Sequence, residues 1–250
     1  MSSEPLPPHP PLGRYYPDGG ASGDEHRAFV IDLFDRTAPH YNWIQGVMSF
    51  GAGLRYRRDA LERAGLAPGM RVLDIAVGTG LTARAALEVT GGSSSVIGLD
   101  ASAGMLHVAR SVGIPLVRAL AEHLPVATDS VDFLTMGYAL RHVDDLKATF
   151  REYHRVLRPG GRLMVLELTR PTGSRWRDAL ARVYLQQLVP LVAQLGPGGS
   201  EARKLMEYCW DTVEGCVPPS AVLEALRGAG FGGIEARNRW IFSEYLALAT

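Results

Sequence analysis

The chain has 250 residues, a length that suits one α/β domain with added helices better than two independent cores. Lysine plus arginine and aspartate plus glutamate each total 26, so the formal net charge is +0. This balance excludes strong nonspecific binding to nucleic acid through counterion release, and it favours a small-molecule partner.

Residues 1–23 contain clustered proline, glycine and serine with few large apolar side chains, and we expect a flexible tail ahead of one domain over residues 24–250. From Asp24 to Gly65 the apolar residues recur at helical spacing, which predicts helices that precede a sheet. Within this stretch Arg55, Arg57 and Arg58 could hold a phosphate, but arginines on a polar helix face are usually solvated, and we expect solvation.

Short apolar runs then alternate with amphipathic segments, which predicts a parallel sheet with helical crossovers. The predicted strands are residues 71–75, 95–99, 116–120, 131–136 and 162–168. An apolar insertion over residues 175–215, broken by glycines near 196–199, predicts helices that cover one end of the pocket as a substrate lid. A helix at 219–229 and strands at 232–238 and 241–249 complete a seven-stranded Rossmann-like α/β sheet.

A glycine-rich turn follows the first predicted strand, with small residues at Ala76, Gly78 and Gly80. A ligand can approach the backbone closely at such a turn, although a purely structural tight turn has the same pattern. Asp100 ends the next strand, where nucleotide-binding units use a carboxylate to bind both ribose hydroxyls. Asp74 directly before the turn would repel a pyrophosphate and attract an ammonium group, which favours S-adenosylmethionine as the cofactor.

Several segments together resemble the ubiquinone/menaquinone biosynthesis C-methyltransferase family of class I S-adenosylmethionine-dependent methyltransferases. They are residues 72–80 (VLDIAVGTG), 121–125 (AEHLP), 129–133 (DSVDF), 140–143 (LRHV) and 153–171 (YHRVLRPGGRLMVLELTRP). Residues 34–41 (FDRTAPHY) and 48–58 (MSFGAGLRYRR) are similar to that family's N-terminal helices. The resemblance fades beyond Pro171, and residues 240–245 stand where the family has a glycine pair and a histidine.

The resemblance implies that Thr79 contacts the cofactor, that Asp100 holds the ribose, and that Leu120 and Ala121 lie beside the adenine. The family usually has Asp or Asn in place of Leu120 and often Ser in place of Gly137, so two polar contacts are expected to be absent. The whole expected cofactor site comprises Asp74, Ala76, Gly78, Thr79, Gly80, Asp100, Ala101, Met105, Leu120, Ala121, Glu122 and Gly137.

Methyl transfer from a sulfonium mainly requires alignment and exclusion of water, so no metal or protein nucleophile is expected. An aromatic carbon acceptor needs a base or a cation near its phenol oxygen. Arg141 matches an arginine of the family that is thought to act near the substrate hydroxyl, and His142 could serve as the base or cap the next helix. Tyr41 is the third catalytic candidate, while Glu167 at a strand end favours a structural hydrogen bond.

The sequence therefore predicts an S-adenosylmethionine-dependent enzyme that methylates a small aromatic, quinone-like or secondary-metabolite acceptor, with carbon favoured over oxygen or nitrogen. A cyclase or isomerase that keeps this scaffold and uses the cofactor only as a structural or electrostatic element is the alternative. An NAD-dependent oxidoreductase is disfavoured by Asp74.

Two isolated cysteines, Cys209 and Cys216, fit neither a disulfide scaffold nor a zinc site and indicate a reducing cytoplasm. No apolar run reaches the roughly 20 residues of a membrane helix, and the start lacks a signal peptide, so we expect no integral membrane segment. The sequence leaves two alternatives open. One is loose contact between an apolar helix face and a membrane, and the other is a homodimer.

Overall fold

Seven strands form one mixed sheet in the order β3-β2-β1-β4-β5-β7-β6. The computed structural model describes residues 23–169, 175–239 and 241–250, so the expected tail and Trp240 lie outside the described residues, apart from Gly23, which already begins a helix. The strands are β1 (Arg71–Ile75), β2 (Ser95–Asp100), β3 (Leu116–Arg118), β4 (Val131–Gly137), β5 (Leu157–Leu168), β6 (Phe231–Arg239) and β7 (Phe242–Ala249). All neighbouring pairs among β1 to β5 are parallel, and β7 runs antiparallel to both of its neighbours.

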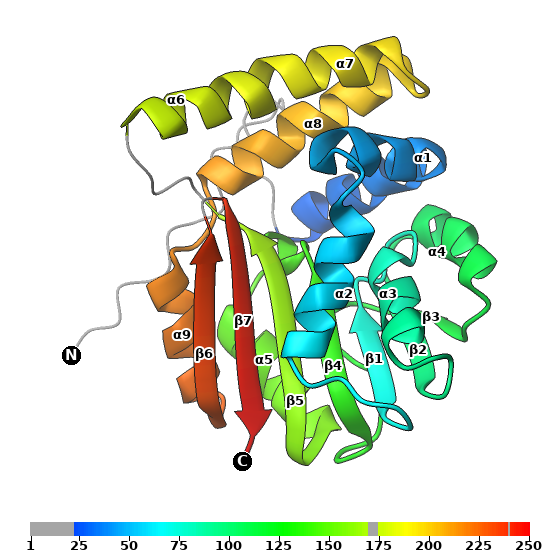
Figure 1. Ribbon diagram of the computed structural model, residues 1–250, viewed down its shortest axis with the longest axis vertical. Helices are drawn as coiled ribbons and strands as arrows, with labels where there is room; N and C mark the ends of the chain where they lie inside the picture. The colour runs from blue at the N-terminus through cyan, green and yellow to red at the C-terminus, as the bar shows by residue number, and fades with distance from the viewer. Residues whose placement is uncertain (1–22, 170–174, 240) are drawn as a thin grey trace.

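Helices cover both faces of this sheet (Figure 1). On one face α2 (Gly53–Arg63) and α3 (Leu81–Val89) share a buried cluster with Val72, Phe133 and Met164. On the other, α5 (Leu146–Val156) and α9 (Pro219–Gly228) bury Phe150 and Leu226 against the strands. Shorter elements complete this part of the chain, namely α4 (Ala103–Ala109), η1 (Arg110–Val112) and η2 (Leu140–His142).

A third helical layer lies across the carboxyl ends of the parallel strands, at the top of Figure 1. It consists of α1 (Gly23–Ser49), α6 (Arg175–Arg182), the π-helix η3 (Val183–Leu188), α7 (Val189–Leu195) and α8 (Gly199–Glu214). Its own cluster includes Leu33, Ile44, Leu205 and Tyr208. Within the described ranges, no helix is long and apolar enough to cross a membrane.

Helix α1 is fastened to the start of α4 through Asp35. One carboxylate oxygen of Asp35 accepts hydrogen bonds from the backbone amide of Gly104, at 2.8 Å, and from the hydroxyl of Ser102, at 2.5 Å. A Cβ atom on Gly104 would lie 2.7 Å from the backbone oxygen of Asp35, so only glycine permits this approach. The contact holds α1 over the end of β2.

The crossover before β5 differs from its prediction in one respect. Asp145 caps α5, since its Oδ1 accepts bonds from the amides of Lys147 and Ala148 at 2.8 and 3.0 Å. The strand was predicted to begin at residue 162, but β5 already begins at Leu157 and includes Gly160 and Gly161. The pairing moves from Val131↔Leu157 to Phe133↔Arg162, so the glycines form a bulge within the strand.

Candidate active site

The turn after β1 has a backbone that strongly favours small residues. Ala76, Gly78 and Gly80 have φ angles of 51°, 55° and 89°. A Cβ atom on Gly80 would come within 2.5 Å of Val112, so glycine lets the start of α3 pack against η1. The turn therefore brings backbone close to the carboxyl end of β2.

Asp100 fixes the position of this turn. Its Oδ2 accepts a hydrogen bond from the amide of Gly78 at 2.8 Å, and its Oδ1 accepts one from the amide of Ser102 at 2.9 Å. Burial raises the pKa of Asp100, while these amides oppose the increase. Each oxygen has a second lone pair, so the carboxylate can also accept hydrogen bonds from a ligand.

A cavity of about 860 Å³, including the open solvent at its mouth, lies over the carboxyl ends of β1, β2 and β4. This edge, at the carboxyl ends of the parallel strands, is where open α/β sheets bind ligands. Its lining residues are Arg27, Val30, Ile31, Phe34, Tyr41, Ala76, Gly78, Leu99, Asp100, Ala101, Ser102, Met105, Ala119, Leu120, Ala121, Glu122, Met136, Gly137, Tyr138, Ala139, His142 and Val143.

Most residues of the expected site line this cavity. They are Ala76, Gly78, Asp100, Ala101, Met105, Leu120, Ala121, Glu122 and Gly137 from the cofactor set, and Tyr41 and His142 from the catalytic set. Four expected residues lie elsewhere, namely Asp74, Thr79, Gly80 and Arg141. The Thr79 hydroxyl is 2.5 Å from Oδ1 of Asn42, so it ties the turn to α1.

Asp74 is fully buried beside the turn, and neither of its carboxyl oxygens has a hydrogen-bond partner. Burial raises the pKa of Asp74 to about 8, although the positive charge of Arg57 opposes the increase. An unsatisfied buried carboxyl group in a native protein requires an explanation, and a ligand ammonium group that reaches it would supply one. Together with the cavity and Asp100, this feature fits an adenosylmethionine site.

Arg141 has a structural environment that the sequence did not reveal. Its Nη1 lies 2.6 Å from Oε1 of Glu167, and both side chains are buried. The same guanidinium donates to the carbonyl of Tyr138 and to the hydroxyl of Thr212. Burial disfavours the charge, but Glu167 and other neighbours outweigh it and raise the pKa of Arg141. Arg141 therefore joins β4, β5 and α8, and the structural hydrogen bond expected for Glu167 is observed.

His142 presents its ring to the cavity in an orientation fixed by aromatic neighbours. Its Nδ1 lies 3.1 Å from the hydroxyl of Tyr208, and the two rings stack with an interplanar angle of 11°. The ring of Phe34 contacts the imidazole edge-on. The cap of α5 is Asp145, so the capping alternative for His142 was wrong.

Tyr41 is partly buried and lines the same cavity as this histidine, and its hydroxyl oxygen accepts a bond from Nε2 of Gln45 at 3.0 Å. Burial raises the pKa of Tyr41, which keeps the phenol neutral. Phe34 packs against the Tyr41 ring at a centroid distance of 6.1 Å. Tyr41 therefore contributes a neutral, mostly apolar wall.

Arg57 is the residue for which the sequence prediction was wrong. Arg55 and Arg58 are exposed as expected, but Arg57 is only 4% exposed and its guanidinium lies 4.8 Å from the centroid of Tyr138. Its Nη1 donates to the carbonyl of Gly53, and its Nε has no partner. Leu54, Arg57 and Leu61 share one helix face, and this spacing could have indicated burial.

Tyr138 forms part of the cavity wall in a strained backbone conformation, with a φ angle of 64°. Burial raises the pKa of its phenol to about 12, while Arg57 opposes the increase. Non-glycine residues in this region of φ are uncommon and cluster at functional sites.

The cover of the cavity comes from α1, which contributes Arg27, Val30, Ile31, Phe34 and Tyr41. None of the lining residues belongs to the described part of the helical insertion, which was expected to act as the lid. The insertion contacts a lining residue from behind, because the hydroxyl of Tyr208 on α8 lies within hydrogen-bond distance of His142. Arg27 closes one edge through an ion pair with Asp144 at 2.6 Å.

Gly137 lacks the side chain that the resembled family often has, and the structure shows what occupies that space. A Cβ atom on Gly137 would lie 2.8 Å from the hydroxyl oxygen of Thr82 on α3. The hydroxyl of Thr82 therefore fills part of the volume that a serine at position 137 would need.

Comparison with known proteins gives a consistent result. The model of the ubiE/COQ5 methyltransferase family matches residues 21–239. A demethylmenaquinone methyltransferase of Geobacillus kaustophilus is 33% identical over 217 residues, which cover 83% of this chain and 90% of the relative.

Solved structures share the fold at lower identity. A methyltransferase of Thermotoga maritima, described as a possible histamine N-methyltransferase, has a TM-score of 0.62 at 21% identity and covers 88% of this chain and 99% of its own. The 4+2 cyclase SpnF has a TM-score of 0.64 at 18% identity and covers 97% of both chains. These likenesses show the α/β methyltransferase fold.

Proposed function

Because the chain belongs to the ubiE/COQ5 methyltransferase family and is an S-adenosylmethionine-dependent enzyme, we propose that it methylates a carbon atom of a small aromatic or quinone-like acceptor. The observation that carries this proposal is the cavity in which the turn after β1 and Asp100 share one space with Tyr138 and His142. Bound adenosylmethionine supplies a methyl group on a positively charged sulfur.

Two regions of the cavity wall have different surroundings. Ala76, Ala119 and Ala121 pack against the buried cluster of the sheet, whereas Phe34 and Tyr41 pack against the cluster of the helical cap. We assign the first region to the cofactor, with Asp100 for the ribose. Asp74 lies behind this wall, outside the cavity lining, and we assign it to the cofactor ammonium group on the basis of its charge. The second region, lined by aromatic rings, suits a flat aromatic acceptor.

His142 is the proposed base. A phenol or hydroquinone acceptor becomes more nucleophilic at carbon when its hydroxyl loses a proton, and a neutral imidazole can accept that proton near neutral pH. The stacked ring and hydroxyl of Tyr208 hold the imidazole in place. After carbon methylation the ring proton passes to solvent, and the imidazolium returns its proton to the acceptor oxygen.

Arg57 is the proposed source of positive charge behind the acceptor. Its charge acts on the buried carboxyl group of Asp74, where it opposes the increase in pKa caused by burial, and on the ring of Tyr138 at the cavity wall. A fixed buried cation favours the negative charge that develops on the acceptor oxygen. Arg141 cannot do this as well, because Glu167 neutralises it.

The Geobacillus relative is called a demethylmenaquinone methyltransferase, and this name supports a demethylmenaquinone-like ring as the acceptor in our proposal for the present chain. The reaction would take place in the cytoplasm, where the thiols of Cys209 and Cys216 remain reduced. The experiment is a turnover mixture of enzyme, adenosylmethionine and a panel of reduced naphthoquinones and phenols, followed by mass spectrometry. A product heavier by one methylene group and an equivalent amount of adenosylhomocysteine support the proposal.

A cyclase or isomerase is the second candidate, and the likeness to a 4+2 cyclase over nearly the whole chain is the observation that keeps it. Fold alone does not decide between the two reactions. In the same experiment, a product of unchanged mass with no adenosylhomocysteine would favour this candidate and contradict methylation.

A further inference from the structure

Seven exposed apolar side chains gather on one outer face of the cap. Ten large apolar side chains are exposed among the described residues, and the other three lie on strands. The seven are Phe50, Trp176, Leu180, Val183, Leu188, Leu191 and Leu195, each between 50% and 82% exposed. They lie on α6, η3, α7 and, for Phe50, in the turn directly after α1, and we call them the outer apolar face.

The three consecutive helices form one rod outside α8, at the top of Figure 1. The exposed residues recur at helical spacing. The intervals are four and three residues in the trio Trp176, Leu180 and Val183, and three and four residues in the trio Leu188, Leu191 and Leu195. These spacings place each trio on one side of a helix. A soluble monomer rarely leaves so many large apolar groups together in water, so the face has an interaction partner.

Charge is distributed in a specific way along this rod. Residues 183–200 contain no Asp, Glu, Lys or Arg. The preceding helix α6 has the sequence RWRDALAR, in which three arginines and one aspartate give a net charge of +2. An uncharged apolar stretch that follows a basic, tryptophan-containing turn is typical of helices that lie in a membrane interface.

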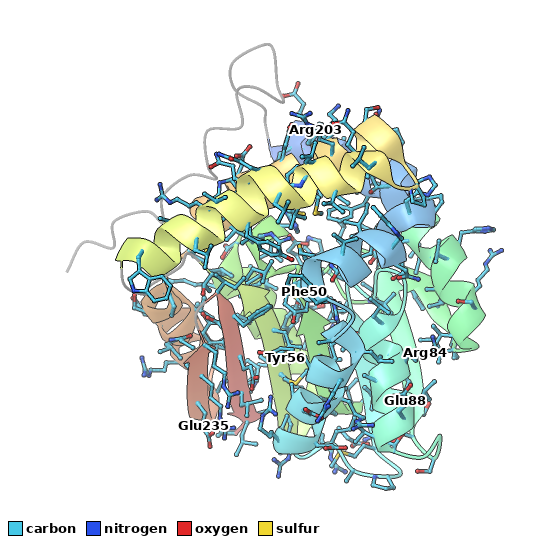
Figure 2. The ribbon with its side chains drawn as sticks, turned by 45° about the horizontal axis from the view of Figure 1, so that its top comes forward. Phe50, Tyr56, Arg84, Glu88, Arg203 and Glu235 are labelled. Carbon is cyan, nitrogen blue, oxygen red and sulfur yellow. The ribbon has the colours of Figure 1, made fainter. Side chains whose placement is uncertain are left out.

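A groove beside the rod adds to this apolar surface. It is lined by Trp43, Gly46, Val47, Phe50, Tyr184, Leu188, Val189 and Val192 and encloses about 870 Å³, including open solvent. The rings of Phe50 and Tyr184 stack at 5.4 Å with an interplanar angle of 17°. Figure 2 shows Phe50 directly below the rod, where it extends the apolar face toward α1.

We propose that the outer apolar face docks this enzyme on the surface of a lipid bilayer that contains anionic headgroups. The apolar side chains enter the boundary between headgroups and acyl chains, and the net positive charge of the α6 sequence favours anionic headgroups. The rod lies in the plane of the membrane surface without crossing it. This binding depends on the protein surface and not on the identity of the methyl acceptor.

The test uses the full chain and sedimentation with vesicles of phosphatidylcholine, with and without phosphatidylglycerol. We expect binding to the mixed vesicles, weaker binding to the neutral ones, and a further loss at high salt. Leu191→Glu combined with Leu195→Glu should weaken binding at least about tenfold, since each removes an exposed apolar contact and adds a like charge. Exposed Leu→Glu changes on a helix cost little stability.

Gln194→Glu is the matched control, because it adds one negative charge to the same helix next to Arg203, which already donates to Gln194 at 2.9 Å. It should retain most of the vesicle binding. Calorimetric titration with adenosylhomocysteine checks that every variant is folded. Equal vesicle binding by the wild type and the double variant, or no binding by either, overturns the proposal.

Two further measurements test whether the outer apolar face enters the lipid and whether it instead joins two copies of the chain. Brominated lipids should quench the fluorescence of Trp176, and Trp176→Phe should reduce that quenching relative to the wild type. Trp43, which lines the adjoining groove, can contribute to the remaining quenching, whereas Trp210 is buried. Light scattering after size exclusion gives the oligomeric state without lipid. If the wild type is a dimer and the double variant is a monomer, the face joins two copies of the chain, and the membrane proposal is wrong.

Discussion

The guanidinium of Arg57 lies 4.8 Å from the ring centroid of Tyr138, although the two residues are 81 positions apart. Arg57 is buried and Tyr138 lines the cavity. This pair brings a positive charge from α2 to the wall of the proposed acceptor site.

Arg57→Met should therefore lower kcat by about tenfold to a hundredfold, because the charge that favours an acceptor anion is lost. Arg57→Lys retains the charge and should recover part of the rate. Steady-state kinetics with both substrates tests this, and adenosylhomocysteine titration of each variant shows whether the cofactor region is intact. Equal kcat values for the methionine variant and the wild type would exclude an electrostatic role for Arg57.

The Arg141–Glu167 pair should contribute to stability far more than a surface pair. Glu167→Gln leaves a buried arginine without its carboxylate and should lower the free energy of unfolding by about 3–5 kcal/mol. The control is Glu207→Gln, which weakens an exposed pair with Arg203 and should cost less than about 1 kcal/mol. Urea unfolding curves for the two variants compare these values directly. Similar losses would mean that the buried pair has no special structural role.

Asp74 should make stability fall as pH rises. The unfolded chain releases this proton near pH 3.8, whereas burial holds the folded-state pKa at about 8. Between these values the folded state binds more protons, so the free energy of unfolding decreases with increasing pH. Asp74→Asn should remove this dependence and exceed wild-type stability above about pH 8, by on the order of 5 kcal/mol. Parallel pH profiles for wild type and variant would contradict the prediction.

The same carboxyl group should make cofactor affinity depend on pH in the opposite direction. In the free enzyme Asp74 is protonated below about pH 8, and a cofactor ammonium group pairs only with its ionised form. Affinity for adenosylmethionine should therefore rise between about pH 6 and pH 7.5, by at most about tenfold per unit. Calorimetry on wild type and Asp74→Asn measures the difference, and the variant should show a much flatter profile.

Gly137 and Thr82 should behave as a coupled pair. Gly137→Ser alone would crowd the Thr82 hydroxyl and should weaken cofactor binding, whereas Gly137→Ser with Thr82→Ala provides the space. The double variant should bind adenosylhomocysteine better than the single serine variant, with a coupling energy of about 0.5–3 kcal/mol. Additive effects in this double-mutant cycle would show that the two positions do not compete for space.

Much of the fold could be predicted from the sequence because buried parallel strands are short apolar runs, as in 71–75 and 131–136. Asp74, Gly78 and Asp100 were also accessible to prediction, since a turn between a strand and a helix imposes a local pattern. The ion pair of Arg141 could not be predicted from local sequence, because its partner Glu167 is 26 residues away and is brought close to it by the pairing of β4 with β5. The cover by α1 depended on the contact between Asp35 and Gly104, which is equally nonlocal.

The most direct test of methyl transfer to carbon is turnover with adenosylmethionine that carries a carbon-13 methyl group and a reduced naphthoquinone acceptor. Carbon NMR of the product distinguishes an aryl methyl group from a methoxy or N-methyl group. We expect an aryl methyl signal that grows with the release of adenosylhomocysteine and is strongly reduced in His142→Ala. A methoxy or N-methyl signal, or a cyclised product without the label, would contradict the account.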